Sequence, residues 1–236
     1  VFSLEMPDTQ LAGRMLVGGS GVNSGSFRTG DIDADSWRRL EQAAAELSAL
    51  PVYFSDCANI TMGTIRSQCK AMARRGRCGM VIIDYLQLLD TASRNTNSTR
   101  EREIAAASRT DPMISSRSAK LLAKELDVPV ILLSQLSRKI EERTDKTPML
   151  SDLRESGAIE QDADMVLFID RPAMYGRAEI DAGRYGTIPA EGVGLLHIAK
   201  NREGATGCVI FRHNESITRI ADYESTANPS TDGEPF

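Results

Sequence analysis

Three polar side chains with the chemistry to handle a metal ion or a phosphate each follow a short apolar run. They are Glu5, Asp84 and Gln135. In open α/β sheets the carboxyl ends of the strands meet at one edge, where ligands bind. A carboxylate such as Asp84, held there by a buried strand, can orient Mg²⁺ through its waters. The sequence therefore predicts a site at this edge, although strands also end in Asp simply for capping.

The apolar patterns around these residues predict alternating strands and helices. The expected strands are apolar on both faces, which is typical of a parallel sheet covered by helices. We therefore expect an α/β fold with a mainly parallel, twisted sheet flanked by helices. Strands are predicted at 1–4, 52–55, 80–84, 128–133 and 165–169, and a C-terminal β-hairpin at Leu195–Ala199 and Cys208–Phe211.

Helices are predicted where apolar residues recur at helical spacing. The expected N-caps are Asp8 for the first helix, Asp35 or Ser36 for the second, and Thr61 for the third. A further helix is expected at Ser116–Leu126, and Trp37 is expected to anchor the second helix in the core. The Gly- and Ser-rich stretch Gly18–Gly30 is expected to be a loop.

The composition is that of a soluble globular protein, with 41% hydrophobic and 26% charged residues among 236. No apolar run approaches the ~20 residues that span a bilayer, and no signal peptide is visible, so we expect a cytoplasmic protein without membrane contact. The four cysteines lack metal-site spacing and are expected to be free thiols. The net charge of −5 argues weakly against a monomeric nucleic-acid binder, but not against a ring with basic channel loops.

Four segments, in a fixed order, resemble those of one protein family. They are Phe2–Pro7 (FSLEMP), Ile83–Leu88 (IDYLQL), Leu133–Leu136 (LSQL) and Ser151–Asp164 (SDLRESGAIEQDAD). Together they resemble the C-terminal, RecA-like ATPase domain of DnaB-type replicative DNA helicases, over roughly Val1 to Tyr223. The resemblance implies a P-loop NTPase fold, ATP and Mg²⁺ as ligands, and a homo-hexamer that unwinds duplex DNA at the replication fork.

The resemblance also implies roles at the predicted sheet edge. Glu5 would activate the water that attacks the γ-phosphate, Asp84 would hold Mg²⁺ through water, and Gln135 would sense the γ-phosphate through its amide. The simpler alternatives are a helix-start carboxylate for Glu5 and a polar strand-end residue for Gln135.

Two further sets of residues take roles from the resemblance. Arg154, Glu155 and Gly157 would lie in a loop that tracks single-stranded DNA in the ring channel, with Arg154 pairing with phosphate. Lys200 and Arg202 would reach the ATP site of the adjacent subunit, with Arg202 as the arginine finger. The alternatives are an ordinary loop and a solvated charged turn.

The sequence departs from the family in two places. It contains no G-x-x-x-x-G-K-[ST] P-loop, so the first strand and the P-loop helix are expected to be missing and this chain to hydrolyse ATP poorly alone. An apparent insertion near Arg109–Ile114 includes Pro112, which predicts a helix, a break near Thr110–Met113, and then a second helix.

We assign residues 1–224 to a partial motor domain and 225–236 to a disordered tail rich in Ser, Thr, Pro and acidic residues. The resemblance also implies primase and a helicase loader as partners, through an N-terminal domain of the family that this sequence is expected to lack. Two other functions remain open. The chain could be a non-catalytic remnant that acts as an interaction module, or a RecA- or RadA-type recombination ATPase. A nucleotide-independent DNA-binding protein is disfavoured by the acidic balance.

Overall fold

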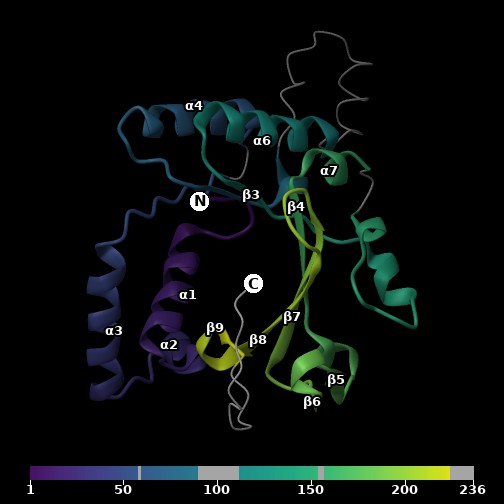
Figure 1. Ribbon diagram of the computed structural model, residues 1–236. Helices are drawn as coiled ribbons and strands as arrows, with labels where there is room; N and C mark the ends of the chain where they lie inside the picture. Colours follow the sequence, from purple (N-terminus) through teal and green to yellow (C-terminus); the bar gives the residue numbers. More distant parts are fainter. Residues whose placement is uncertain (58–59, 90–111, 154–156, 224–236) are drawn as a thin grey trace, which may run out of the picture.

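The computed structural model describes residues 1–57, 60–89, 112–153 and 157–223 (Figure 1). The helix expected before Pro112, the predicted DNA-binding residues Arg154 and Glu155, and the predicted tail lie outside these residues. Within them, none of the helices is both long and apolar enough to cross a membrane.

A three-stranded parallel sheet forms the core of the molecule. Its strands are β1 (Phe2–Ser3), β2 (Val81–Asp84) and β3 (Val130–Leu132), in the order β1-β2-β3. The register pairs Phe2 with Ile83 and Ile83 with Leu132, so β2 is the central strand. The prediction of an α/β fold with a parallel sheet is confirmed. The strand expected at 52–55 is wrong in extent, because only Ser55 forms a bridge, with Phe2.

Two helices lie on the same side of this sheet (Figure 1). They are α4 (Met62–Ala73) and α6 (Pro112–Leu126), which pack against each other. Ile65 of α4, Ile83 of β2 and Leu122 of α6 are at most 1% exposed and belong to one apolar cluster. Burial of these side chains is the main force that holds helices and sheet together. The predicted helix break near Thr110–Met113 is wrong at its C-terminal end, because Pro112 and Met113 already belong to α6. Proline is favourable in the first turn of a helix, where its missing N–H group is not needed.

A second sheet is antiparallel. It consists of β4 (Met165–Asp170), β7 (Val193–Asn201), β8 (Gly207–Asn214) and β9 (Arg219–Asp222), in the order β4-β7-β8-β9. The predicted C-terminal hairpin is confirmed as β7–β8. The predicted strand at 165–169 is β4, but it pairs antiparallel with β7 and not with the parallel sheet. A small hairpin, β5 (Glu179–Asp181) and β6 (Thr187–Pro189), precedes β7.

Three helices follow β1: α1 (Asp8–Ser20), α2 (Ser24–Thr29) and α3 (Ala34–Ser48). The loop expected at Gly18–Gly30 is therefore wrong for most of its length. Asn23 caps α2 by accepting bonds from the amides of Gly25 and Ser26, and Gly21 ends α1 at a φ of 66°. The Gly and Ser residues thus mark two helix boundaries, not one continuous loop.

The expected N-caps are right for one helix out of three. The Thr61 hydroxyl accepts a bond from the Thr64 amide at 3.2 Å, as predicted. Asp33, not Asp35 or Ser36, caps α3 and accepts from the Ser36 amide at 2.7 Å. Pro7 occupies the N-cap position of α1, so Asp8 is its first helical residue.

Trp37 is not a core anchor. It is 56% exposed, whereas Leu40 and Ala43 on the same helix are buried. The buried face of α3 therefore includes Leu40 and Ala43 but not Trp37, although all three lie at helical spacing. The remaining short helices are η1 (Leu86–Leu88), η3 (Arg138–Glu142), η4 (Leu150–Asp152), α7 (Gly157–Asp162), η5 (Pro172–Tyr175), η6 (Gly183–Tyr185) and η7 (Glu215–Ile217).

Candidate active site

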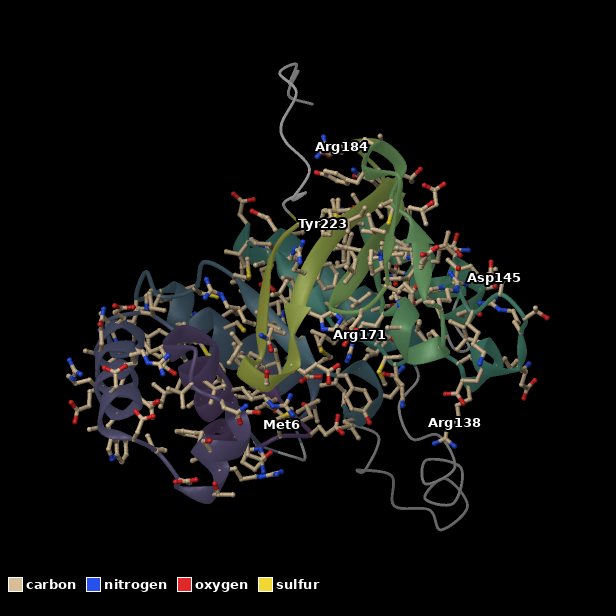
Figure 2. The ribbon with its side chains drawn as sticks, turned by 90° about the horizontal axis from the view of Figure 1, so that it is seen from below. Met6, Arg138, Asp145, Arg171, Arg184 and Tyr223 are labelled. Atoms are coloured by element: carbon tan, nitrogen blue, oxygen red, sulfur yellow. The ribbon has the colours of Figure 1, made fainter. Side chains whose placement is uncertain are left out.

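The ends of the three parallel strands form one connected edge. The Leu4 amide donates to the Asp84 carbonyl at 2.7 Å, and the Leu133 amide donates to the Ile83 carbonyl at 3.0 Å. Asp84 is the last residue of β2, and Glu5 and Gln135 follow the ends of the neighbouring strands β1 and β3, at the edge where the sequence predicted a ligand site. In Figure 2, Met6 and Arg138, which follow the ends of β1 and β3, lie toward the same side of the molecule.

The turn that carries Glu5 is held by Ser3. This serine is 1% exposed, its hydroxyl donates to the Met6 carbonyl at 2.7 Å, and it accepts from the Met6 amide at 3.3 Å. The buried hydroxyl fixes the backbone on both sides of Glu5, while the Glu5 side chain is exposed. A carboxylate on a fixed turn can receive a proton from a water in front of the sheet edge.

Gln87 joins the ends of β2 and β3. Its amide nitrogen donates to the Ser134 hydroxyl at 3.0 Å and to the Gln135 carbonyl at 3.2 Å, and its amide oxygen accepts from the Gln135 backbone at 3.3 Å. Gln135 itself is exposed beyond this contact. Sequence reasoning missed Gln87, although it lies within the IDYLQL segment, because only the strand register reveals its partners.

The carboxylates at the edge fit a magnesium ion that is carried by a nucleotide. Among the described residues, no group of three or more His, Cys, Asp or Glu side chains forms a metal cage. Asp84 is half-buried at the end of β2. Mg²⁺ commonly binds through one or two carboxylates together with waters and phosphate oxygens, which a single Asp84 satisfies.

Among the described residues, the side-chain hydrogen bonds of Lys200 and Arg202 go to the region around α7 and not to the ends of the parallel strands. The Lys200 ammonium donates to the carbonyls of Glu160 and Ala163, the latter at 2.8 Å. The Arg202 guanidinium donates to the Gln161 carbonyl at 2.5 Å and to the Asp164 carboxylate at 3.1 Å. Both cations thus bind the end of α7 and the residues that follow it, where free carbonyls favour positive charge.

The base of the predicted DNA loop is firmly anchored. Asp152 is 5% exposed and accepts bonds from the Arg143 guanidinium at 2.7 Å and the Met149 amide at 2.9 Å. Leu153 pairs with Leu136 in an antiparallel bridge. The residue before Arg154 is therefore bonded to the residue after Gln135. Gly157, the last residue of the predicted loop set, begins α7.

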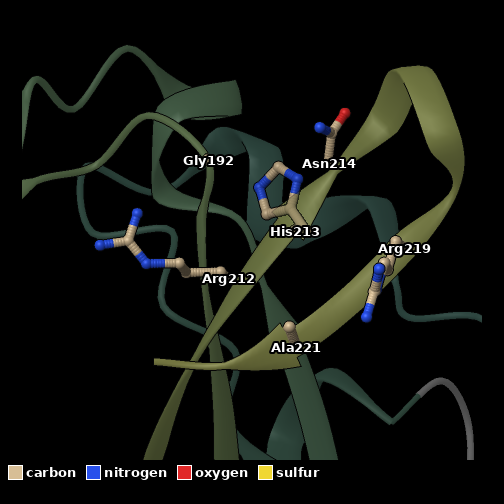
Figure 3. Close-up of a pocket in the computed structure, with 6 residues that line it drawn as sticks. All are labelled: Gly192, Arg212, His213, Asn214, Arg219 and Ala221. Carbon is tan, nitrogen blue, oxygen red and sulfur yellow. The ribbon is translucent and has the colours of Figure 1, made fainter. Parts of the chain in front are cut away.

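A separate cavity of about 240 Å³ lies on the antiparallel sheet, at the turn between β8 and β9 (Figure 3). Its lining residues are Gly192, Arg212, His213, Asn214, Arg219 and Ala221. Burial, and then the nearby Arg171 charge, lowers the pKa of His213, so its imidazole is neutral at pH 7. The Arg212 guanidinium lies 5.0 Å above the Tyr223 ring. The lining includes none of the predicted site residues.

Comparison with known proteins tests the resemblance. Residues 1–222 match the family described as DnaB-like helicase C terminal domain. A replicative DNA helicase DnaB from Geobacillus stearothermophilus is 41% identical over 224 residues, which cover 95% of this chain and 45% of that protein. A replicative DNA helicase DnaC from Bacillus subtilis is 37% identical over 228 residues, which cover 97% of this chain and 45% of that protein.

Two solved structures agree with these sequence relationships. One of them, an ATPase domain, has a TM-score of 0.80 and 34% identity, over 94% of this chain and 73% of that one. A DnaB-like replicative helicase, solved in a study of its interactions with primase, has the same TM-score and identity, over 94% of this chain and 51% of that one. The chain spans less than half the length of the two curated relatives. Since the family match covers almost all of its length, the chain belongs to the DnaB-like helicase C-terminal domain family.

Proposed function

We propose that this chain is the motor part of a ring-shaped replicative DNA helicase, which couples ATP hydrolysis to movement on single-stranded DNA and to unwinding at a fork. The observation that carries the proposal is the edge of the parallel sheet. There Glu5, Asp84 and Gln135 follow adjacent strands, two of which are joined by Gln87, in a chain of the DnaB-like family.

Each residue of the edge has a defined task in hydrolysis. The reaction transfers the γ-phosphoryl group of ATP to water and leaves ADP and phosphate. Glu5 accepts the proton of the attacking water, and Asp84 would hold Mg²⁺, which would offset the phosphate charge when bound. The Gln135 side-chain amide donates to a γ-phosphate oxygen, and Gln87 holds its backbone in place.

In this proposal, single-stranded DNA is bound by the loop that contains Arg154, Glu155 and Gly157. Arg154 pairs with a backbone phosphate, and Glu155 organises the loop. The bridge between Leu136 and Leu153 supports this proposal, because it joins the segment after Gln135 to the start of the loop. A movement of Gln135 on loss of the γ-phosphate can therefore reach the DNA loop through its neighbour Leu136, which is bridged to Leu153.

Hydrolysis is completed between subunits. Lys200 and Arg202 of one subunit approach the ATP of its neighbour in a homo-hexamer, and Arg202 stabilises the charge that develops on the transferred group. A fixed cation that arrives in trans makes hydrolysis depend on ring assembly. Primase and a loader bind other parts of the intact protein; the similarity to a helicase solved in a study of its interactions with primase supports the first of these partners.

The phosphate-binding loop belongs, in this proposal, to the part of the intact protein that precedes Val1. Apolar side chains on two strands support a larger fold: Ile131 of β3 is 44% exposed, and Leu167 and Ile169 of β4 are 47% and 64% exposed. Upstream coding sequence with an in-frame Gly-Lys-Thr or Gly-Lys-Ser would support the enzyme, whereas a stop codon would favour the non-catalytic remnant. The family match favours a helicase over a recombination ATPase.

Unwinding of a forked DNA duplex by the intact protein tests the proposal. We expect strand separation that requires hydrolysable ATP and a single-stranded tail. A blunt duplex and a non-hydrolysable ATP analogue are the matched controls, and both should give no product. Absence of unwinding by an assembled, DNA-binding protein with active ATP hydrolysis would contradict the helicase function.

A further inference from the structure

We infer that Asp164, itself held by Lys120, is a positioning residue that fixes the guanidinium of Arg202 in the orientation needed at the subunit interface. The inference rests on the proposed function, because it gives a structural basis to the role assigned there to Arg202. The resemblance to the helicase family assigned no role to Asp164 or Lys120.

The segment Glu160–Asp164, which comprises the end of α7 and the two residues before β4, is bonded from two sides. From the hairpin side, Lys200 and Arg202 bind its carbonyls and the Asp164 carboxylate. From the helix side, the Ser116 hydroxyl of α6 donates to Asp162 at 2.7 Å. The Arg202 amide also donates to the Asp164 carbonyl at 2.9 Å, so the turn that carries Arg202 is fixed to the same residue.

Asp164 is shared between two cations. Lys120 of α6 pairs with one carboxylate oxygen, and Arg202 pairs with the other. The bond from Lys120, and then the charges of Lys120 and Arg202, hold the pKa of the Asp164 carboxyl below its usual value. The carboxylate is therefore ionised at neutral pH. The Asp164 side chain is 60% exposed, whereas Lys120 is 21% and Arg202 46% exposed, so the contact with Lys120 ties this exposed carboxylate to a largely buried cation of α6.

The charge of this cluster suits a positioning role. A single Asp–Arg pair has no net charge and would weaken the attraction of Arg202 for a phosphate. Lys120 adds one positive charge, so the cluster of three remains cationic. Guanidinium also has five N–H donors, of which the bonds to Gln161 and Asp164 occupy two. The others remain available to a ligand from the neighbouring subunit.

Loss of Asp164 would release a long side chain whose rotamers are otherwise restricted. Charge stabilisation in a transition state depends on donors that are already in place before the reaction. We therefore expect Asp164 to affect kcat more than the KM for ATP. This pattern distinguishes a positioning role from a contribution to ATP binding or to folding.

The test uses the intact, assembled protein with the variants Asp164→Asn, Arg202→Ala and the double variant. Asp35→Asn is the matched control, because Asp35 forms an exposed ion pair with Arg38 at 2.7 Å on α3. Arg202→Ala should lower kcat by roughly 1,000-fold or more. Asp164→Asn should lower kcat by roughly 10- to 100-fold. Loss of a residue that orients a metal ligand by a hydrogen bond has an effect of this size in metalloenzymes. The KM for ATP and the ring assembly should stay close to wild type.

The double variant and a structure complete the test. If Asp164 acts through Arg202, the double variant is no slower than Arg202→Ala, and a crystal structure of nucleotide-free Asp164→Asn shows Arg202 displaced from the Gln161 carbonyl. An unchanged or raised kcat for Asp164→Asn, or additive losses in the double variant, would refute the positioning role and leave the proposed function intact. An unchanged kcat for Arg202→Ala would refute both the interface role of Arg202 and the inference built on it.

Discussion

Asp152 shows how one buried carboxylate can anchor the base of the predicted DNA loop. One of its carboxylate oxygens, Oδ2, accepts bonds from both the Arg143 guanidinium and the Met149 amide, and only 5% of the residue is exposed. These bonds hold the chain immediately before Leu153, whose bridge to Leu136 sets the start of the predicted DNA loop. At the scale of single residues, the loop base is therefore held by charge and hydrogen bonding as well as by packing.

Asp152→Ala should destabilise the fold by about 3 kcal/mol, because it leaves the largely buried Arg143 guanidinium without its charged partner. Urea denaturation of the intact protein measures this change. Asp35→Ala, at an exposed ion pair on α3, is the control and should change the free energy of unfolding by less than about 0.5 kcal/mol. Equal effects of the two substitutions would show that the Asp152 contacts do not stabilise the fold.

Single residues also show what the sequence can and cannot predict about the site. Glu5 and Asp84 were identified because each follows an apolar strand, and the structure places their strands side by side. Gln87 and Ser3 were not identified. Their hydrogen bonds depend on the register of β2 against β3 and on a tight turn after β1, and neither is set by local composition. The roles themselves came from the resemblance to a family.

At the scale of elements, α4 and α6 are joined by a carboxylate between two cations. Glu125 of α6 accepts from Arg66 of α4 at 2.6 Å and pairs with Lys70 of the same helix. The hydrogen bonds from Arg66 and Lys70, and then their charges, lower the pKa of the Glu125 carboxyl to about 2, from its ordinary value of 4.5. The full stabilising contribution of this pairing is therefore present at pH values above about 4.5, the ordinary pKa that Glu125 has in the unfolded chain.

The contribution of Glu125 should be lost as the pH falls from about 4.5 toward 2, because the folded state must then take up a proton that the unfolded state already binds. Glu125→Gln should reduce the pH dependence of the free energy of unfolding within this window. High salt should reduce the wild-type effect, since the pair is partly exposed. Parallel acid-unfolding curves for wild type and variant would contradict the assignment.

The elements were predicted best where the apolar pattern was long. Strand β2 and the hairpin β7–β8 lie where the sequence placed them, and α6 ends at the predicted Leu126 but begins at Pro112, four residues earlier than predicted. The stretch Gly18–Gly30 was misjudged because only Gly21 and Gly30 end helices at positive φ and its other glycines lie within helices, whereas the composition alone indicates a loop. The partner of β4 was also misjudged: an apolar run predicts a strand, but the choice between parallel and antiparallel pairing depends on β7, distant in the sequence.

At the scale of the whole molecule, the net charge is compatible with the proposed DNA binding by a few loops of a ring. The net charge is −5, so the surface as a whole does not attract DNA. In the proposed ring, a few basic side chains such as Arg154 from each subunit collect in one channel. Binding should therefore depend on assembly, in contrast to a protein that binds DNA as a monomer through a broad basic surface.

The central proposal for this protein is that Glu5 activates the water that attacks ATP. The most direct test is the rate of ATP hydrolysis by the intact protein, with and without single-stranded DNA, for wild type, Glu5→Gln and Asp8→Asn. Asp8 is a suitable control because it is an exposed carboxylate three residues away, in the first turn of α1. We predict that Glu5→Gln lowers DNA-stimulated hydrolysis by roughly 100-fold or more with ATP binding retained, while Asp8→Asn stays close to wild type. Wild-type hydrolysis by an assembled Glu5→Gln protein would contradict the account.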